Sequence, residues 1–332
     1  MRVLVTGAGG FIGAILLQLL QQVGQVGQQR ITRLAAMDRK LPLLPESVEC
    51  IEGELQDAQV QSRLARFGAD LCFHLAAVPG GAAEADPALS RRVNLDGTLD
   101  LFNLLAEGRA TGSAPPVVVY ASTIAVYGTT LPDPVTPATP TRPALIYGAH
   151  KRACEILLAD ATRRGVLDGR SLRLPGIVAR PRAASGLVSA FMSELLHALA
   201  AGESVTLPVG PQATAWWMSA QRCAENLLHA AVMDPMLDTE GHMERTWALP
   251  VLRLSMQEVV ETLSAVVGVD GHALVRYAPQ EPVEAVFGRY PVLDDQIARR
   301  LGLRDDGTAA ELVQRALAPY AIQAANPNSS SV

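Results

Sequence analysis

A glycine-rich turn separates the first apolar run of the sequence from its first helical pattern, at residues 6–13 (TGAGGFIG). Gly7 permits a tight turn, Gly10 lets the backbone approach a pyrophosphate, and Gly13 lets the helix pack closely on the strand. The N-terminus of that helix offers a phosphate unpaired N–H groups and about half a positive charge. A turn that binds nothing is the simpler alternative, but the strand-to-helix position favours a dinucleotide site. Its expected contacts are Gly7, Gly10, Phe11, Ile12 and Gly13.

Short apolar runs alternate with helical patterns through the first half of the chain. Strands are expected at residues 3–5, 31–37, 47–51, 71–75, 117–121 and 171–174. Helices are expected between them at residues 11–20, 56–67 and 93–105. This alternation predicts an α/β fold, a Rossmann-type doubly wound parallel sheet with helices on both faces. Beyond residue 180 helical patterns dominate, at residues 186–201, 222–233, 256–267, 294–301 and 308–318, which predicts a smaller, mostly helical substrate-binding region.

The expected domains follow from this change of pattern. Residues 1–174 form the dinucleotide-binding domain, rejoined by about residues 212–233. Residues 175–211 and 234–325 form the substrate-binding region, and residues 326–332 form a flexible tail.

Two stretches interrupt the alternation. Residues 21–29, rich in Gln and Gly, read as a loosened helix end and surface loop, and residues 131–143, which contain five prolines, read as a functional loop or lid.

Composition excludes several classes of protein. The net charge is -5 and no basic run occurs, so nucleic acid is not an expected partner. The four cysteines show no CxxC spacing, which argues against a metal site or a disulfide framework and favours a reducing cytoplasm. No leader pattern and no apolar stretch of about 20 residues occurs, so we expect no membrane association.

An acidic residue ends the second expected strand. Asp38 lies 25 residues after Gly13, where a carboxylate accepts hydrogen bonds from the ribose hydroxyls and repels a 2′-phosphate, so NAD is favoured over NADP. The basic pair that follows, Arg39 and Lys40, leaves NADP possible, and a solvated turn Asp is the simpler alternative. Further expected cofactor contacts at strand ends are Glu54, Leu55, Leu75, Ala76 and Ala77. His74 is expected to be a buried core residue, since apolar residues surround it.

Tyr147 and Lys151 lie four residues apart in a helical pattern, which places them on one helix face with Cβ atoms about 5–6 Å apart. Only two lysines occur in the chain, Lys40 and Lys151, because arginine supplies the other basic residues. A free tyrosine has a pKa of about 10, and about 4 kcal/mol of preferential phenolate stabilisation would bring it near 7. A cation about 4 Å away supplies roughly that amount at an effective dielectric constant of 20. We therefore expect Tyr147 to accept an alcohol proton while a hydride leaves the same carbon.

Hydroxyl residues end the fifth strand, where ligands bind in open α/β sheets. Thr123 or Ser122 is expected to donate a hydrogen bond to the substrate oxygen. Because Ser and Thr are also preferred helix caps, a capping role is an equal alternative.

Taken together, these motifs resemble the extended short-chain dehydrogenase/reductase superfamily. The matching residues are the TGxxGxxG turn, Asp38, the Ser-Thr-x-x-Val-Tyr-Gly run at residues 122–128 and the Tyr147-x-x-x-Lys151 pair. The resemblance implies a catalytic triad of Thr123, Tyr147 and Lys151, in which Lys151 activates Tyr147. It also implies a structural Tyr127, cofactor contacts from Asn94, Pro175 and Ile177, and a homodimer built from residues 93–105 and 146–161.

The second half resembles one family within that superfamily, the D-erythronate dehydrogenases. The similarity lies in residues 172–175, 180–181, 183–186, 216–219 and 291–303. It implies NAD-dependent oxidation of the C2 hydroxyl of a four-carbon sugar acid to the 2-oxo acid. Arg180 and Ser185 are the expected substrate residues beside Ser122, Thr123 and Tyr147, with Arg182 and Trp216 as weaker candidates. The chain departs from the family pattern at Glu54, usually Asp, at Arg182, usually a glycine-containing turn, and at Ala220, usually Pro.

Three other functions are compatible with parts of this pattern. A nucleotide-sugar epimerase would use Tyr147 and Lys151 in the same way but would need room for a nucleoside diphosphate. A dehydratase is disfavoured because Ile124 and Ala125 stand where it would carry an Asp-Glu pair. A non-catalytic NAD(P)-sensing regulator is disfavoured because such proteins commonly lack the Tyr–Lys pair.

Overall fold

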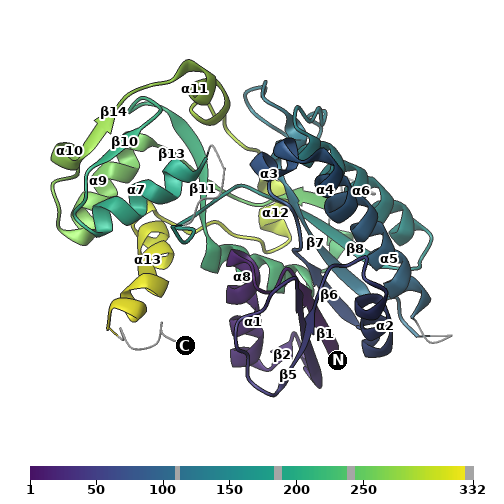
Figure 1. The fold of residues 1–332 in the computed structure, drawn as a ribbon. Coiled ribbons are helices and arrows are strands. Elements are labelled where there is room, and N and C mark those ends of the chain that lie inside the picture. Colours follow the sequence, from purple (N-terminus) through teal and green to yellow (C-terminus); the bar gives the residue numbers. More distant parts are fainter. Residues whose placement is uncertain (109–112, 183–188, 238–243, 326–332) are drawn as a thin grey trace.

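The computed structural model describes residues 1–108, 113–182, 189–237 and 244–325, and the side chains of these up to residue 320. Seven parallel strands form the main sheet, in the order β12-β8-β7-β6-β1-β4-β5 (Figure 1). Their bounds are β1 Arg2–Thr6, β4 Arg33–Asp38, β5 Val48–Glu52, β6 Leu71–His74, β7 Val117–Thr123, β8 Asp168–Leu174 and β12 Thr246–Ala248. The parallel sheet with its flanking helices confirms the predicted doubly wound α/β fold.

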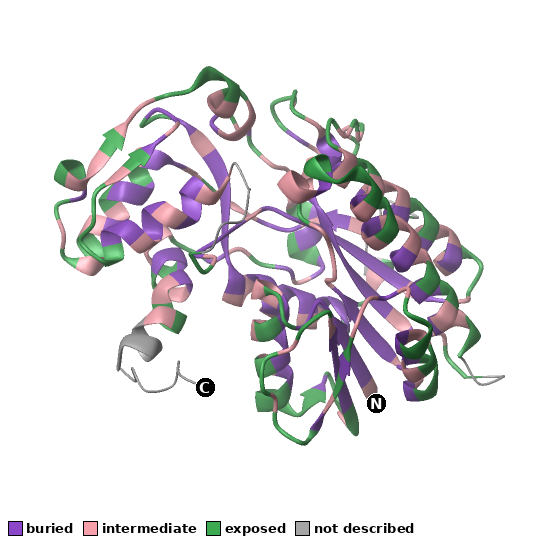
Figure 2. Cartoon of the chain, in the orientation of Figure 1, coloured by how far each residue is buried: buried purple, intermediate pink, exposed green. Residues whose placement is uncertain are grey.

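Helices cover both faces of this sheet. One face packs against α1 (Phe11–Val23), α8 (Ala220–Ala230) and α12 (Gln296–Arg300). The other packs against α2 (Ala58–Phe67), α5 (Gly97–Glu107) and α6 (Ile146–Arg163). Successive strand residues point to opposite faces, and both sets are apolar. In β1, for example, Val3 and Val5 join the first cluster and Leu4 the second, so the central strands are buried on both sides (Figure 2). The edge strand β5 exposes Cys50 and Glu52, and the helices expose their outer sides.

The second half contains more strand than the sequence predicted. A three-stranded sheet, β13-β11-β9, and a two-stranded sheet, β10-β14, accompany the helices of the smaller region. The strands are β9 Gly176–Val178, β10 Val205–Leu207, β11 Thr214–Ser219, β13 Leu252–Ser255 and β14 Val275–Tyr277. The helices are α7 Ala190–Ala200, α9 Met256–Val267, α10 Gly271–Leu274, α11 Glu281–Phe287 and α13 Ala309–Ala325. Strands of three to six residues are too short to show a reliable two-residue period, which explains why the pattern missed them.

Several connections also differ from the sequence-based expectation. Residues 21–23 are the end of α1, as expected, but the expected surface loop after them contains a hairpin of β2 (Gln25–Val26) and β3 (Gln29–Arg30). The expected helix at residues 93–105 begins earlier, as α3 (Gly80–Ala85), α4 (Pro87–Ser90) and a π-helical turn η1 (Arg91–Asp96) precede α5. Short 3-10 helices follow β7 at η2 (Ile124–Tyr127) and α8 at η3 (Pro235–Leu237).

The two regions are joined at several points of the chain. β12 comes from residues that we expected in the substrate-binding region, yet it pairs in parallel with β8 as the edge strand of the main sheet. The proline-rich loop is fixed at Val135, whose N–H donates to Val292 and whose carbonyl accepts from Asp294. The polypeptide between β7 and α6 is thereby attached to the segment after α11. Among the described helices, none combines the length and apolarity needed to span a membrane.

Candidate active site

A cavity of about 610 Å³ opens at the carboxyl edge of the main sheet, between the sheet and the smaller region. Its wall contains most of the sequence-predicted site residues, namely Gly7, Gly10, Phe11, Ile12, Gly13, Leu75, Ala77, Ser122, Thr123, Tyr147, Lys151, Pro175, Ile177 and Arg180. These residues lie at or near the ends of β1, β6, β7, β8 and β9 and on α1 and α6, so only the fold brings them together. Of the weaker candidates, Trp216 also lines the cavity.

The glycine-rich turn forms one end of the cavity. Gly7 has φ +71°, and a Cβ there would lie 2.6 Å from the backbone nitrogen of Ala76, which follows the neighbouring strand β6. A Cβ on Gly13 would collide with the carbonyl group of Gly7. Gly10 begins α1, and no side chain caps the N–H groups of its first turn. The turn therefore presents bare backbone donors to the cavity, as an anion requires.

Asp38 lies beside this turn at the end of β4. Its carboxylate accepts hydrogen bonds from the N–H groups of Gly9 at 3.0 Å and Arg39 at 2.7 Å. A Cβ on Gly9 would approach the same carboxylate to 3.3 Å. The acidic side chain is thus held against the glycine-rich turn without lining the cavity itself.

Four other expected cofactor residues lie outside the cavity wall. Asn94 is buried, and its amide bonds both backbone groups of Val78, which fixes the loop after β6. Leu55 belongs to the hydrophobic core, and Glu54 lies 3.9 Å from Arg92. Ala76 packs beneath Gly7.

The expected triad lies in the middle of the cavity wall. Thr123 ends β7 and caps η2 by accepting a hydrogen bond from the Ala125 N–H group, so the capping alternative is also real. Tyr147 and Lys151 share one face of α6, and Tyr147 is hydrogen-bonded to Thr123. The Lys151 ammonium lies 5.8 Å from the ring centre of Tyr147 and donates to the Ala121 carbonyl at 2.8 Å.

The electrostatics of the phenol differ from the expectation. Burial raises the pKa of Tyr147, and the Arg180 guanidinium and the hydrogen bond to Thr123 oppose that rise. Burial lowers the pKa of Lys151 to about 8. Arg180 is a cation that lowers the pKa of Tyr147, and the Lys151 ammonium turns toward Ala121 and the ring of Tyr120.

Arg180 lines the cavity and extends toward the glycine-rich turn, with its guanidinium 5.9 Å from the ring centre of Phe11. Among the described residues, no carboxylate forms an ion pair with it, and burial lowers its pKa. Arg182, by contrast, is exposed and pairs with Glu194 and Glu203, so it contributes nothing to the cavity. Ser185 lies outside the described residues.

Ser122, Tyr127 and His74 each form hydrogen bonds with other residues of the protein. The Ser122 hydroxyl donates to the buried carboxylate of Glu155, so it is not available to a substrate as we expected. Tyr127 accepts a hydrogen bond from Arg173 and lies outside the cavity wall. His74 bonds Thr6 and Thr98 inside the core, and burial lowers its pKa to about 3.

Sequence reasoning missed the far side of the cavity. Its additional lining residues include Glu84, Leu131, Met192, Ser193, Phe287 and Tyr290. No periodic or motif signal marks them, because they lie on α3, in the proline-rich loop, on α7 and at or after the end of α11, and only the whole fold brings these segments together. The described residues contain no group of three or more His, Cys, Asp or Glu side chains arranged to hold a metal ion.

Comparison with known proteins agrees with this geometry. Residues 3–232 match the NAD dependent epimerase/dehydratase family. The chain belongs to that family. It is 33% identical to the D-erythronate dehydrogenase of Cupriavidus necator over 95% of this chain and 97% of the relative. It is 28% identical to that of Haemophilus influenzae, over 95% and 98%. Among solved structures, a nucleoside-diphosphate-sugar epimerase from Agrobacterium tumefaciens superposes with a TM-score of 0.88 and 31% identity, over 96% of this chain and 94% of that one.

As a member of the NAD dependent epimerase/dehydratase family, the protein is an NAD-dependent oxidoreductase. The residues present fit this cofactor. The bare glycine-rich turn, in which no Cβ could be accommodated at Gly7 or Gly13, leaves room for a pyrophosphate against the start of α1. Small and apolar residues, Leu75, Ala77, Pro175 and Ile177, line the continuation of the cavity toward the triad.

Proposed function

We propose that the protein oxidises the C2 hydroxyl of a small sugar acid, D-erythronate or a close analogue, to the 2-oxo acid. The observation that carries this proposal is Arg180, a cation in the cavity wall that acts on Tyr147 and has no carboxylate partner among the described residues. A guanidinium binds a carboxylate through two parallel hydrogen bonds. With the carboxylate on Arg180, the adjacent C2 hydroxyl is the group nearest to Tyr147.

The charges of the cavity wall favour one carboxylate over a nucleoside diphosphate. Lys151 and Arg180 are the cations among the described lining residues, and Glu84 is an anion. On the smaller region, the described lining residues Ser193, Trp216 and Tyr290 carry no charge. A diphosphate needs several charge-assisted donors beyond those that bind the cofactor. The main alternative is a nucleotide-sugar epimerase, because the similar structure from Agrobacterium is described as a nucleoside-diphosphate-sugar epimerase.

The proposed mechanism uses the triad in the middle of the cavity. Thr123 donates a hydrogen bond to the substrate oxygen, and Tyr147 as phenolate accepts the proton of the C2 hydroxyl. Arg180 favours that phenolate before an acid binds. With the substrate carboxylate on Arg180, the Lys151 ammonium, held on Ala121, is the other described cation of the cavity wall that favours the phenolate. When bound, NAD supplies the hydride acceptor and a positive ring that further favours the phenolate.

The proposed cofactor contacts follow the cavity wall. The pyrophosphate binds to the backbone of Gly7, Gly10, Phe11, Ile12 and Gly13. The Asp38 carboxylate accepts hydrogen bonds from the ribose hydroxyls. Asn94, Glu54, Leu55 and Ala76 contribute by fixing the loops around the adenine half of the site. Residues 1–174, together with Pro175 and Ile177, thus supply the cofactor site, and Arg180 belongs to the substrate site.

We also propose a cytoplasmic homodimer built on α5 and α6, which contact each other on one face of the main sheet (Figure 1). Two apolar residues of α6 support this interface, Ile156 at 49% and Leu157 at 42% exposure. The absence of disulfides among the four cysteines fits a reducing compartment. Sedimentation of the wild type and of Leu157→Glu tests the dimer, and a wild type that stays monomeric at micromolar concentration contradicts it.

A substrate panel tests the main proposal. The purified enzyme is given NAD with four-carbon sugar acids or with nucleotide sugars, and NADH absorbance is recorded. We expect NADH only with the sugar acids, because an epimerase returns its hydride and accumulates none. Arg180→Gln should raise KM for the acid at least tenfold, whereas Arg182→Gln, the surface arginine two residues away, should not. Epimerised nucleotide sugar without NADH, or equal KM values in both variants, overturns the proposal.

A further inference from the structure

A buried carboxylate lies directly behind the triad. Glu155 is fully buried on α6 and accepts hydrogen bonds from Arg173 on β8 at 3.0 and 2.8 Å. Arg152 adds a third contact at 3.1 Å, and the Ser122 hydroxyl a fourth. Since an unpaired buried charge costs several kcal/mol, the four contacts offset the cost of burying this carboxylate.

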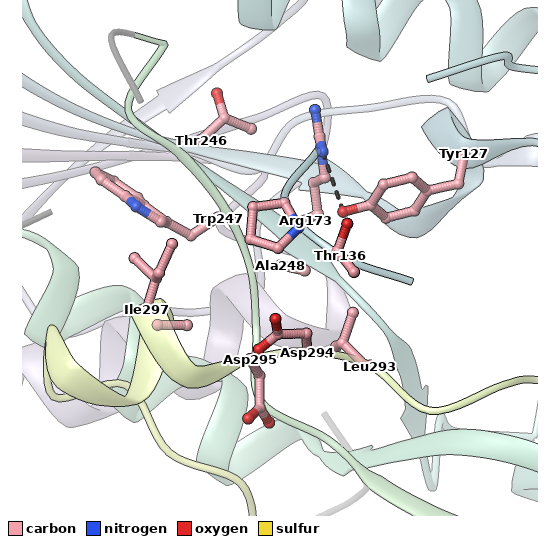
Figure 3. Close-up of a pocket in the computed structure, with 12 residues that line it drawn as sticks. Tyr127, Thr136, Arg173, Thr246, Trp247, Ala248, Leu293, Asp294, Asp295 and Ile297 are labelled. Atoms are coloured by element: carbon pink, nitrogen blue, oxygen red, sulfur yellow. Dashed lines mark hydrogen bonds between the residues drawn. The ribbon is translucent and has the colours of Figure 1, made fainter. Parts of the chain in front are cut away.

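Arg173 extends this cluster. Its guanidinium donates to the Tyr127 hydroxyl at 3.1 Å, and both side chains line a cavity of about 30 Å³ (Figure 3). Such a cavity has room for about one water molecule. The Asp295 carboxylate on the opposite wall is already paired with Arg299. Arg173 is therefore committed to Glu155 and Tyr127.

Glu155 lies one helical turn after Lys151, so the two side chains share a helix face with Cβ atoms about 5–6 Å apart. The titratable and charged groups around Lys151 are His74, Tyr120, Tyr147, Cys154 and Glu155, with Arg173 beyond Glu155. Burial raises the pKa values of Tyr120, Tyr147 and Cys154 and lowers that of His74 to about 3, so these four are neutral near pH 7. Among the described residues, Glu155 is the carboxylate that acts on Lys151.

We propose that Glu155 is a positioning residue of the active site, the buried counter-charge that holds Lys151 as an ammonium and turns the Ser122 hydroxyl away from the cavity. The role of Lys151 in turnover rests on the proposed function, but its ionisation does not. Burial lowers the pKa of Lys151 to about 8, so a modest further fall would leave the side chain mostly neutral at pH 7. Glu155 opposes that fall.

The lysine content of the chain provides a direct test. Protein labelled with ¹³C at lysine Cε gives two side-chain signals, from Lys40 and Lys151, and Lys40→Arg assigns them. Lys40 is exposed and serves as an internal reference. In Glu155→Gln we expect the Lys151 titration to move about one to two units to lower pH, from the charge interaction at about 6 Å and an effective dielectric constant of 20.

Two further variants separate this effect from a loss of stability. Asp168→Asn removes a carboxylate from the buried Arg170 on the same strand as Arg173, but away from Lys151, and should leave the titration unchanged. Arg173→Gln leaves Glu155 with Arg152 and should move the Lys151 titration to higher pH. Opposite shifts in the Glu155 and Arg173 variants support the proposal.

An unchanged Lys151 titration in folded Glu155→Gln overturns the proposal. If that variant does not fold, an unchanged or lower titration in Arg173→Gln overturns it instead. Because the measurement needs no substrate, failure of the enzyme to turn over D-erythronate contradicts the proposed function and leaves this result intact.

Discussion

Replacement of Tyr147 by phenylalanine tests the central chemical claim. The substitution removes one hydroxyl group from the cavity wall and leaves the ring, and with it the packing on α6, in place. Removal of a general acid or base typically slows turnover 10²- to 10⁴-fold, which is about 2.7–5.5 kcal/mol in the activation barrier. The lost hydrogen bond to Thr123 should change the free energy of unfolding by only about 0.5–1.5 kcal/mol.

Tyr127→Phe is the matched control. It removes the same atom from the same ring type, but there the hydroxyl accepts a hydrogen bond from the buried Arg173 and lies outside the cavity wall. An unsatisfied buried donor costs about 1–3 kcal/mol, so this variant should lose more stability than Tyr147→Phe. Its turnover should stay close to that of the wild type.

We therefore expect Tyr147→Phe to lose turnover but little stability, and Tyr127→Phe to lose stability but little turnover. Turnover is measured by NADH absorbance with D-erythronate, cofactor binding by titration with NAD, and stability by urea unfolding. We expect Tyr147→Phe to bind NAD normally and to turn over at least a hundredfold more slowly. Turnover of Tyr147→Phe within tenfold of the wild type, or an equal loss in Tyr127→Phe, would refute the assignment of Tyr147 as the base.

Three further predictions concern the cofactor and the phenol. Asp38→Ala should relax the preference for NAD over NADP, because it removes the carboxylate beside the glycine-rich turn. If the ratio of kcat/KM with NAD to kcat/KM with NADP is the same in the variant and the wild type, another group sets the preference. Gly13→Ala should abolish stabilisation by NAD in a thermal melt, because the added Cβ would collide with the Gly7 carbonyl. Gly165→Ala is the control: the space around that residue is open, so the variant should still be stabilised by NAD. Arg180→Gln should move the midpoint of the rising limb of the kcat/KM-against-pH profile to higher pH. The reason is that Arg180 lowers the pKa of Tyr147 and the phenolate is the active form. A shift of that midpoint to lower pH would contradict this assignment.

The first half of the fold was predictable because its signals are local. The central strands of the main sheet are largely apolar on both faces, and helices separate most of the consecutive strands, so the alternation predicts both the elements and the parallel arrangement. The smaller region lacks such a signal. β9, β10 and β14 are three residues long, and their strand conformation depends on partners far away in the sequence, such as Trp217 beside Gly176.

The site shows the same division. The glycine-rich turn and the Tyr147–Lys151 spacing are local, and both line the cavity as expected. Sequence spacing places two side chains on one helix face, but it does not determine the atoms toward which they turn. Lys151 therefore reaches back to the Ala121 carbonyl, and Ser122 donates to a carboxylate 33 residues away, neither of which a motif contains.

The consequence is that positive charge near the phenol comes from two elements with different roles. Lys151 is fixed by the Ala121 carbonyl, and Glu155 acts on it from one turn further along α6, whereas Arg180 approaches from the segment after β9 and has no carboxylate of its own among the described residues. A cation without a partner is the one that a substrate carboxylate can neutralise. Binding of an acid to Arg180 would then reduce its effect on Tyr147, so an acid substrate would raise the pKa of the phenol while placing the C2 hydroxyl beside it. Substrates that lack a carboxylate would gain neither the contact nor the alignment, which is the physical reason to expect selectivity for hydroxy acids.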